Sequence, residues 1–311
     1  MEISDKVTIL RDGRKAAELD TADTTVQELS HYMIGRELKQ EETARDSSLE
    51  HSVLELLNVS NQHGKGSRHK LENISLAVHG REILGIAGVE GNGQKELAEV
   101  ITGIQKTAGG SIRLDGEEIS TRNVRSRYEA GISYISDDRI LDSLVTGMDI
   151  TENLLLRDFR KAPFAKGGVT NRRAMKDHAL SKMERYQVRA SGRSGPDTPV
   201  RLLSGGNQQK LIIARELTDH CRVIVASQPT RGLDIGATDF VRKLLVEQRN
   251  AGKAVLLISA DLEEIMALSD RIAVLFNGQI AGILDRQEAT VQKIGLLMGG
   301  ITGEEGEGHE A

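Results

Sequence analysis

The sequence predicts an α/β domain with a buried, mainly parallel sheet, and three observations support this fold class. The runs Ile83–Ala87, Val223–Ala226 and Val255–Ile258 are almost wholly apolar, as expected for strands that are covered on both faces. A glycine-rich turn and a helix-forming segment follow the first run. Another helix-forming segment begins with a serine and two glycines at Ser204.

The remaining elements are expected to form two smaller parts beside this sheet. Strands separated by loops are expected at Ser75–Val78, Glu82–Ala87 and Ser111–Gly116. The stretch from about 142 to 205 is richer in helix formers, and we interpret it as a helical subdomain. The simplest interpretation of its basic residues is that they form a solvated face: Arg157, Arg160, Lys161, Arg172 and Arg173.

Composition limits the class of protein. A chain of 311 residues can bury a full core, and 41 basic against 46 acidic residues give a net charge of −5. This balance does not indicate a nucleic acid or an anionic membrane surface as a partner. The single cysteine, Cys221, and the lack of a signal-peptide pattern indicate the reducing cytoplasm. The apolar runs are too short to cross a bilayer, so any membrane role is expected to come through a partner.

An internal repeat relates the first residues of the chain to its last strands. Residues 3–13 match residues 268–278, and the match continues without a gap to the pair Met33 and Met298, which read as packing residues. The period approaches the length of a whole domain, so residues 1–38 are predicted to be the C-terminal remnant of a preceding copy. The alternative is that two unrelated strand-turn-helix pieces share a pattern.

The repeat also suggests the domain boundaries. Residues 39–52 are polar and charged, as expected of a linker, and the second copy is expected to occupy residues 53–300. Residues 301–311 are acidic and rich in glycine, and they are predicted to form a disordered tail.

The glycine-rich turn has the spacing of a phosphate-binding loop. Gly88 and Gly93 stand where the motif G-x-x-x-x-G-K-[ST] requires glycine, with Gly91 between them, but Gln94 and Lys95 occupy the two final positions. A neutral glutamine therefore replaces the phosphate-binding lysine, and a lysine replaces the hydroxyl residue that binds Mg²⁺. Taken alone, the segment also fits an ordinary tight turn.

Two further segments indicate a nucleotide protein. The first runs from Leu203 to Lys210 with the sequence LSGGNQQK, and the second is QPTRGLD, from Gln228 to Asp234. A serine and two glycines at a helix start present a hydroxyl and free backbone N–H groups, which suit phosphate oxygens.

In this order and spacing, the three segments resemble the nucleotide-binding domains of ABC transporters. More narrowly, they resemble the second domain of the tandem ATPases that drive bacterial uptake of simple sugars and nucleosides. The resemblance covers about residues 53–300. It implies a P-loop NTPase fold of the ABC type, with a mainly parallel core sheet, an antiparallel β subdomain and a helical subdomain.

The resemblance also implies roles for individual residues. Ser204, Gly205 and Gly206 match the signature motif, which touches the γ-phosphate of an ATP held by the opposite domain. Asp234 belongs to the loop that lies between the two domains. The residues expected to face the chain's own ATP are Gly88, Gly91, Asn92, Gly93, Gln94, Lys95, Glu96 and Asp137.

Several expected chemical groups are missing. Ser227 and Gln228 stand where the family has a Mg²⁺-binding aspartate and a glutamate that polarises water, and Ala260 replaces a histidine. Asp137 replaces the expected glutamine and is the one candidate Mg²⁺ ligand. No clear aromatic residue stands near residues 63–69 to stack on adenine. Losing several such groups predicts that the chain's own site does not hydrolyse ATP.

The resemblance implies the ATP-binding component of an ABC importer for simple sugars or nucleosides, at the cytoplasmic face of the membrane, with ATP and Mg²⁺ as cofactors. Its expected partners are a second nucleotide-binding domain, transmembrane permease subunits and, indirectly, an extracytoplasmic binding protein, but not nucleic acid. Closure is expected to reach the permease through residues 137–153. The alternatives are a soluble ABC-type ATPase outside transport and a non-catalytic regulatory fragment.

Overall fold

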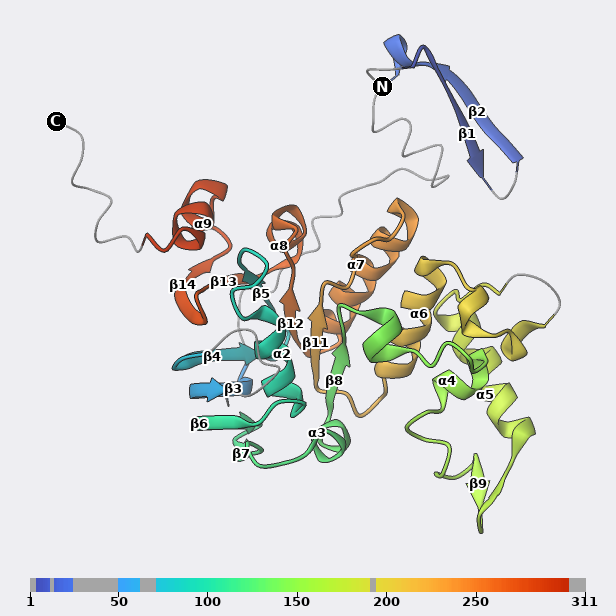
Figure 1. Ribbon diagram of the computed structural model, residues 1–311, viewed down its shortest axis with the longest axis horizontal. Helices are drawn as coiled ribbons and strands as arrows, with labels where there is room; N and C mark the ends of the chain where they lie inside the picture. Colours follow the sequence, from blue (N-terminus) through green and yellow to red (C-terminus); the bar gives the residue numbers. More distant parts are fainter. Residues whose placement is uncertain (1–3, 12–13, 25–49, 62–70, 191–193, 302–311) are drawn as a thin grey trace.

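The computed structural model describes residues 4–11, 14–24, 50–61, 71–190 and 194–301. Three predicted segments lie wholly or mostly outside the described residues: the linker at 39–52, the segment at 63–69 and the tail at 301–311. A six-stranded sheet forms the centre of the molecule (Figure 1), with the order β14-β13-β5-β12-β11-β8. Its strands are β5 (Ile83–Ala87), β8 (Ile132–Ile135), β11 (Val223–Ser227), β12 (Ala254–Ile258), β13 (Arg271–Phe276) and β14 (Gln279–Asp285).

The direction of the strands confirms the predicted core. All neighbouring pairs of this sheet are parallel except β13 and β14, which are antiparallel. A second, antiparallel sheet has the order β4-β3-β6-β7. The predicted strand at Ser111–Gly116 begins earlier and ends at Leu114, because Asp115 and Gly116 turn the chain with positive φ angles of 48° and 79°. The strands of the second sheet are β3 (Ser52–Asn61), β4 (Ile74–His79), β6 (Thr107–Leu114) and β7 (Glu117–Glu118).

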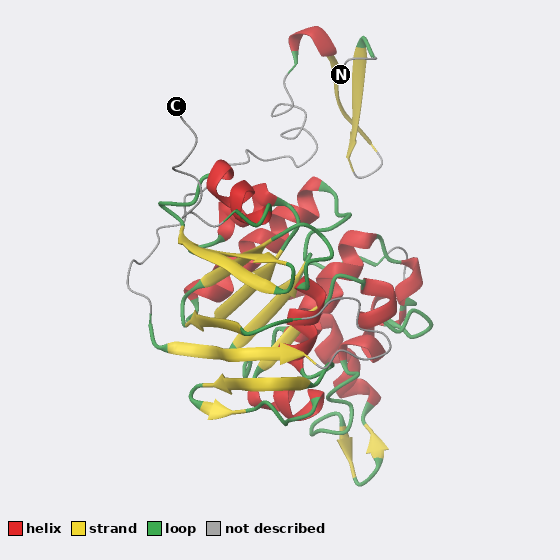
Figure 2. Ribbon diagram, turned by 60° about the vertical axis from the view of Figure 1, so that its left-hand side comes forward, coloured by secondary structure: helices red, strands yellow, loops and turns green. Residues whose placement is uncertain are grey.

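The central sheet separates two apolar cores, which explains its uniformly apolar strands. In β12, Val255 and Leu257 contribute to one core, whereas Leu256 and Ile258 contribute to the other. Helices cover the first face, and α2 and the antiparallel sheet cover the second (Figure 2). Since successive side chains of a strand point to opposite faces, both sets of positions must be apolar. The helices that accompany the two sheets are α2 (Gln94–Thr102), α3 (Val124–Ala130), α6 (Gly205–Glu216), α7 (Ile235–Asn250), α8 (Leu262–Leu268) and α9 (Val291–Met298).

The predicted helical stretch contains helices α4 (Ile150–Leu154) and α5 (Arg172–Arg185). Asp149 and Glu152 form a capping box at the start of α4. The stretch also contains a short antiparallel pair that sequence reasoning did not predict, β9 (Ala165–Lys166) and β10 (Val169–Thr170). Its connecting residues form single helical turns: η2 (Arg139–Ser143), η3 (Gly195–Asp197) and η4 (Val200–Leu202). Within the described residues, no helix is both long and apolar enough to cross a membrane.

The first hairpin repeats the pairing of the last one. Strands β1 (Lys6–Arg11) and β2 (Arg14–Asp20), followed by the turn η1 (Thr21–Asp23), form a two-stranded sheet of their own (Figure 1). Lys6 pairs with Asp20 as Arg271 pairs with Asp285, and every later pair follows at the same shift of 265 residues. Even the register irregularity recurs, between residues 9 and 10 and between residues 274 and 275. The internal repeat therefore extends from the sequence to the strand pairing.

Candidate functional site

The loop between β5 and α2 depends on its glycines. Gly91 and Gly93 have positive φ angles of 99° and 107°, which glycine adopts without steric strain. At Gly88 the restriction is space, because a Cβ atom would lie 2.6 Å from the carbonyl oxygen of Leu275 and 2.6 Å from Nε2 of Gln94. The loop therefore follows the tight path that the spacing of its glycines predicts.

The side chain of Gln94 folds back onto this loop. Its Nε2 donates to the carbonyl oxygen of Val89 at 2.8 Å, and its Oε1 accepts from the backbone N–H of Asn92 at 3.0 Å. The glutamine thus takes up one backbone donor of the kind that a phosphate-binding loop offers to its ligand. Sequence reasoning identified Gln94 as a substitution but not this internal bond.

Lys95 points toward carboxylates beyond the loop. Its Nζ lies 3.6 Å from Asp142 and 3.9 Å from Glu99. Burial lowers the pKa of Lys95, but the nearby carboxylates of Asp142, Asp137 and Glu99 outweigh that effect and hold its pKa above the ordinary value. Lys95 therefore carries a full charge at neutral pH, and this charge connects α2 to the segment around η2.

The structure brings most of the predicted nucleotide-binding residues to one cavity of about 150 Å³. An ion pair between Arg231 and Glu90, 3.2 Å long, joins two further residues of its lining. Asn92 is not part of the lining, and its Oδ1 accepts from the backbone N–H of Asn277 at 3.1 Å. The predicted residues that line the cavity are Gly88, Gly91, Gly93, Gln94, Lys95, Glu96, Asp137, Ser227, Gln228 and Ala260.

Two residues of the cavity lining have unusual local structure: Asp137 has a buried oxygen without a hydrogen bond to any described residue, and Gln228 has a left-handed backbone conformation. Oδ1 of Asp137 is buried and has no hydrogen-bond partner among the described residues. Gln228 has a positive φ of 47°, and its backbone N–H donates to the carbonyl oxygen of Ile258 at 2.7 Å. Within the described part of the chain, no three His, Cys, Asp or Glu side chains gather as metal ligands would.

The signature segment forms the start of α6. Ser204 is the exposed N-cap residue, and its Oγ accepts from the Nδ2 group of Asn207 at 3.0 Å and from the backbone N–H of that residue at 3.4 Å. Gly206 is buried, and a Cβ atom there would lie 2.9 Å from Cβ of Ala237 and 3.3 Å from Oδ2 of Asp234. Glycine at this position therefore allows the starts of α6 and α7 to lie close together.

Asp234 has a structural role that sequence reasoning missed. It is the N-cap residue of α7, and its Oδ1 accepts from the backbone N–H of Ala237 at 2.9 Å. The loop before it is held by Arg139, whose Nη1 donates to the carbonyl oxygen of Arg231 at 2.8 Å. An aspartate directly before the start of a helix is a common N-cap residue, so the sequence did contain a signal for this role. Neither Asp234 nor Ser204, Gly205 and Gly206 line the cavity at the phosphate loop.

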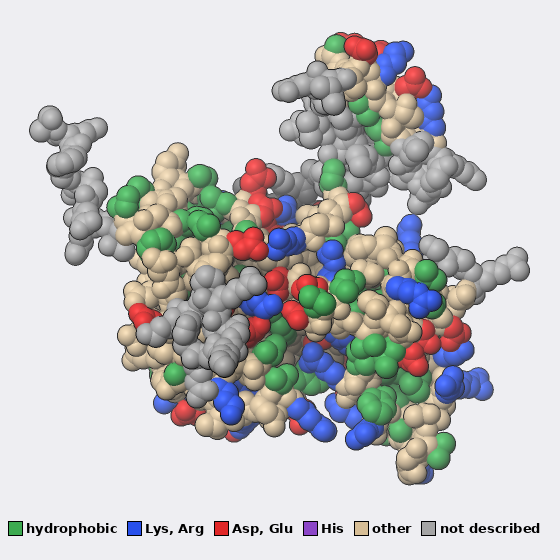
Figure 3. All heavy atoms as spheres, in the orientation of Figure 1, with side chains coloured by type: hydrophobic (Ala, Val, Ile, Leu, Met, Phe, Trp, Pro, Cys, Tyr) green, Lys and Arg blue, Asp and Glu red, His purple; other side chains and the backbone are tan. Residues whose placement is uncertain are grey.

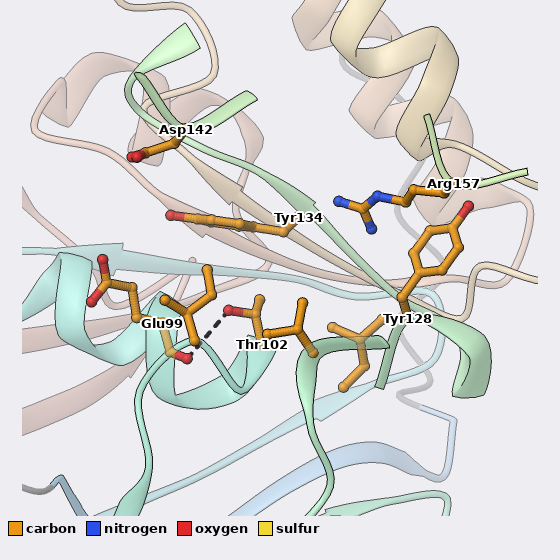
Figure 4. A pocket seen from close by; sticks show the side chains of 9 residues that line it. Glu99, Thr102, Tyr128, Tyr134, Asp142 and Arg157 are labelled. Carbon is orange, nitrogen blue, oxygen red and sulfur yellow. Dashed lines mark hydrogen bonds between the residues drawn. The ribbon is translucent and has the colours of Figure 1, made fainter. Parts of the chain in front are cut away.

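A second cavity, of about 220 Å³, lies between α2, α3, β8 and residue 157, and we call it the groove. Figure 4 shows Tyr134 across its middle, with Glu99 and Asp142 at one end and Arg157 and Tyr128 at the other. The guanidinium of Arg157 lies 4.4 Å from the centre of the Tyr128 ring. Burial raises the pKa of both tyrosines, to about 12 for Tyr128, so both hydroxyls stay protonated well above neutral pH.

Comparison with known proteins identifies the family. The family model described as "ABC transporter" matches residues 71–231, which is more than half of the chain. The chain is 46% identical over 307 residues to the guanosine import ATP-binding protein NupO of Bacillus subtilis, covering 97% of this chain and 59% of that protein. It is 39% identical to the nucleoside import ATP-binding protein NupA of Lactococcus lactis, covering 96% of this chain and 58% of that protein. The chain thus spans less than two thirds of the length of these relatives.

Solved structures confirm the fold. A nucleotide-free ATP-binding cassette from an ABC transporter superimposes with a TM-score of 0.65 at 24% identity, covering 78% of this chain and 95% of that cassette. The dimeric structure of MJ0796, a bacterial ABC transporter cassette, superimposes with a TM-score of 0.62 at 23% identity, covering 75% of this chain and 98% of that one. The parallel core, the antiparallel sheet and the matching family model lead to one conclusion. The chain belongs to the ABC transporter family, as an ATP-binding domain.

Proposed function

We propose that this chain is the ATP-binding component of an importer for nucleosides or simple sugars, and that its two nucleotide-facing regions serve different ATP sites. The signature helix completes the site of a partner cassette, whereas the chain's own phosphate loop is degenerate. The import functions printed for NupO and NupA support the class of transport. The dimeric cassette of similar fold supports a partner domain.

The position of Ser204 is the observation that carries this proposal. Ser204 is exposed at the start of a twelve-residue helix, yet it does not line the cavity at the chain's own phosphate loop. A helix start with a hydroxyl and free N–H groups suits a phosphate oxygen. Since Ser204 does not line the chain's own cavity, we infer that the nucleotide it serves is presented by another domain.

The chain's own cavity fits Mg²⁺–ATP poorly. Gln94 is neutral and bonds to the loop itself, and Lys95 is paired with carboxylates. Ser227 and Ala260 stand at the positions of the missing aspartate and histidine, and Asp137 is left as a lone candidate metal ligand. A triphosphate would meet little unpaired positive charge here, because Lys95 and Arg231 of the lining are both paired with carboxylates. We therefore infer weak nucleotide binding without turnover. The ATP that is hydrolysed, together with its Mg²⁺, would be held by the partner cassette.

The groove is the proposed contact with the permease. Ile104 and Val124 at its lining are 51% and 42% exposed, which leaves apolar surface beside the buried Tyr128 and the half-buried Tyr134. Asp142 lines the groove and also pairs with Lys95 of the phosphate-loop helix. A segment docked here would thus be connected to the nucleotide cavity through residues 137–153. This arrangement would hold the chain at the cytoplasmic face of the membrane, with any extracytoplasmic binding protein acting through the permease.

The first hairpin is proposed to belong to a preceding cassette. In the complete copy, β13 pairs with β14 on one side and with β5 on the other. The identical register of β1 and β2 supports an equivalent place for β1 beside a strand like β5 in another copy. Residues 1–38 would then end the first cassette, residues 39–52 would link it, and residues 53–300 would form the second, with a helical subdomain at about 142–205.

Measurement of ATP hydrolysis with and without a partner tests this proposal. We expect negligible turnover by the purified chain and normal turnover when it is joined to a cassette with a complete phosphate loop, together with their permease. Turnover by the chain alone at ordinary ATPase rates would contradict the proposal. Failure to co-purify with integral membrane subunits would instead favour a soluble ABC-type ATPase.

A further inference from the structure

A strongly basic segment projects from the helical part of the molecule, although the chain as a whole is acidic. Residues 157–176, which we call the basic arm, contain seven Lys or Arg residues and a single acidic residue, Asp158. The arm includes β9, β10 and the first turns of α5. Figure 3 shows Lys and Arg side chains gathered over this part of the molecule, with hydrophobic side chains among them. The total charge of −5 therefore gives no indication of this local excess of basic residues.

Only part of this charge is neutralised within the chain. Lys161 pairs with Asp158 at 2.6 Å, and Lys176 pairs with Asp197 at 2.8 Å. Arg157 pairs with Glu216 at 3.1 Å. In the described parts of the chain, no carboxylate lies within ion-pair distance of the four other basic residues of the arm, which are all exposed: Arg160, Lys166, Arg172 and Arg173.

The placement of two arginines disfavours a purely structural role. Arg172 and Arg173 are the first two residues of α5, where the helix dipole is positive and favours acidic residues. These arginines therefore make the isolated helix less stable than acidic residues would. Both arginines are exposed, so they are available to an anionic partner at this end of the helix.

Apolar side chains accompany the charges. Val169 is 73% exposed in β10, and Phe159 is 41% exposed, with the guanidinium of Arg160 lying 5.2 Å from its ring centre. Exposed apolar groups between lysines and arginines are typical of surfaces that bind at the interface of an anionic bilayer. A nucleic-acid surface would not require the exposed valine.

We propose that the basic arm binds the anionic headgroups of the phospholipid bilayer that surrounds the permease. This inference rests on the proposed function, because Arg157 both begins the arm and lines the groove where the permease is proposed to dock. The arm then lies beside the protein contact and faces the same membrane. Lipid contact would orient the helical part of the cassette when the groove is occupied.

Vesicle flotation with the purified chain tests this proposal without permease or nucleotide, so its result is independent of the ATP site. We expect the chain to float with phosphatidylglycerol-containing vesicles but not with pure phosphatidylcholine vesicles. Binding should weaken as salt is raised from about 0.05 M to 0.5 M, because screening shortens the reach of surface charges. Equal binding to both kinds of vesicle, or binding to neither, would overturn the proposal.

A pair of matched variants locates the contact. Arg172→Glu with Arg173→Glu reverses two charges in the first turn of α5, a change that the helix dipole favours. The control, Arg125→Glu with Lys293→Glu, makes the same change of net charge in the first turns of α3 and α9, and it also removes the ion pair between Arg125 and Glu129. At about a fivefold contribution per basic residue, the loss of two should make the arm variant partition at least about twenty-fivefold more weakly, while the control should retain most of the binding.

The proposal fails if both variants lose binding equally, because total charge would then explain the result. It also fails if the arm variant floats like the unmodified chain, or if the chain binds RNA at the arm and leaves anionic vesicles free. Circular dichroism confirms that each variant is folded before its binding is compared.

Discussion

Two helices of this cassette begin in glycine-rich segments, and they differ in what their starts contact. The start of α2 is closed by its own chain, because Gln94 accepts from Asn92 and donates to Val89 within the loop. The start of α6 is open, because its cap Ser204 is exposed and lies outside the cavity. Both segments resemble phosphate-binding sequences, but the first lines a cavity of its own chain, whereas the second lies outside that cavity.

Under the proposed function, this cassette supplies one half of a partner's ATP site while its own phosphate loop is degenerate. The glycines that allow the tight loop at α2 are retained, so the fold around the loop is preserved. The charged groups have changed, as with Gln94 and Ser227. The residues that allow the tight path of the loop are therefore distinct from the residues that would supply charge to a phosphate. The following predictions test this division.

The largest effect is expected from Ser204→Arg in the assembled transporter. A bulky cation at the start of α6 would block the approach of the partner's nucleotide, and ATP hydrolysis should fall by about a hundredfold or more. Steady-state phosphate release measures the rate. Thr290→Arg is the control, because it also replaces the N-cap residue of a helix, α9, and removes a comparable capping bond. Similar losses in both variants would show that capping, and not the site, explains the effect.

The second prediction concerns Gln94→Lys. A lysine would replace the neutral amide and supply a charged donor to a phosphate, so ATP should bind the isolated chain about tenfold more tightly. Titration with a fluorescent ATP analogue measures the affinity. Gln279→Lys adds the same charge at the start of β14 and should leave the affinity unchanged. An unchanged affinity for Gln94→Lys would mean that the glutamine is not what weakens this site.

The two signature glycines should differ in their effects on stability. In Gly206→Ala, the new Cβ atom would lie 2.9 Å from Cβ of Ala237, and overpacking of this kind lowers stability by about 1–3 kcal/mol. In Gly205→Ala, the nearest atom would be 3.7 Å away, so the free energy of unfolding should change little. Urea denaturation compares the two. Equal destabilisation would contradict the close packing of the starts of α6 and α7.

The smallest effect is expected from Glu99→Gln, beside Lys95. Burial raises the pKa of the Glu99 carboxyl above its ordinary value of 4.5, so the native state holds this proton more tightly than the unfolded state does. The carboxyl therefore contributes stability below pH 4.5, and this contribution is lost as the pH rises through its raised pKa. The glutamine variant should gain a fraction of a kcal/mol relative to the unmodified chain at pH 7, and none at pH 4. Urea titrations at both pH values measure this difference, and a gain that is independent of pH would contradict the assignment.

The sequence predicted the fold well because periodicity reports burial directly. Apolar runs such as Val255–Ile258 became parallel central strands, since both faces of that sheet are covered. The pair β9 and β10 was missed because its strands have only two residues each, too few for any periodic signal. The short strand β7 escapes prediction for the same reason.

The sequence predicted most of the residues that line the cavity, but not the hydrogen bonds that they form. The glycine spacing identified the loop, and the missing charges identified the departures. Gln94 could have pointed outward or inward, and only the folded loop shows that it bonds to Val89 and Asn92. The groove depends on residues separated in sequence, such as Tyr134 and Arg157, which no local pattern connects.

Counting trapped nucleotide in the assembled transporter tests the central claim most directly. After turnover in the presence of orthovanadate, ADP remains only where a site has passed through hydrolysis. The account predicts one trapped ADP for each pair of cassettes, bound at the partner's phosphate loop and lost on Ser204→Arg. Two trapped nucleotides for each pair, or trapping at the Gln94 loop of this chain, would contradict it.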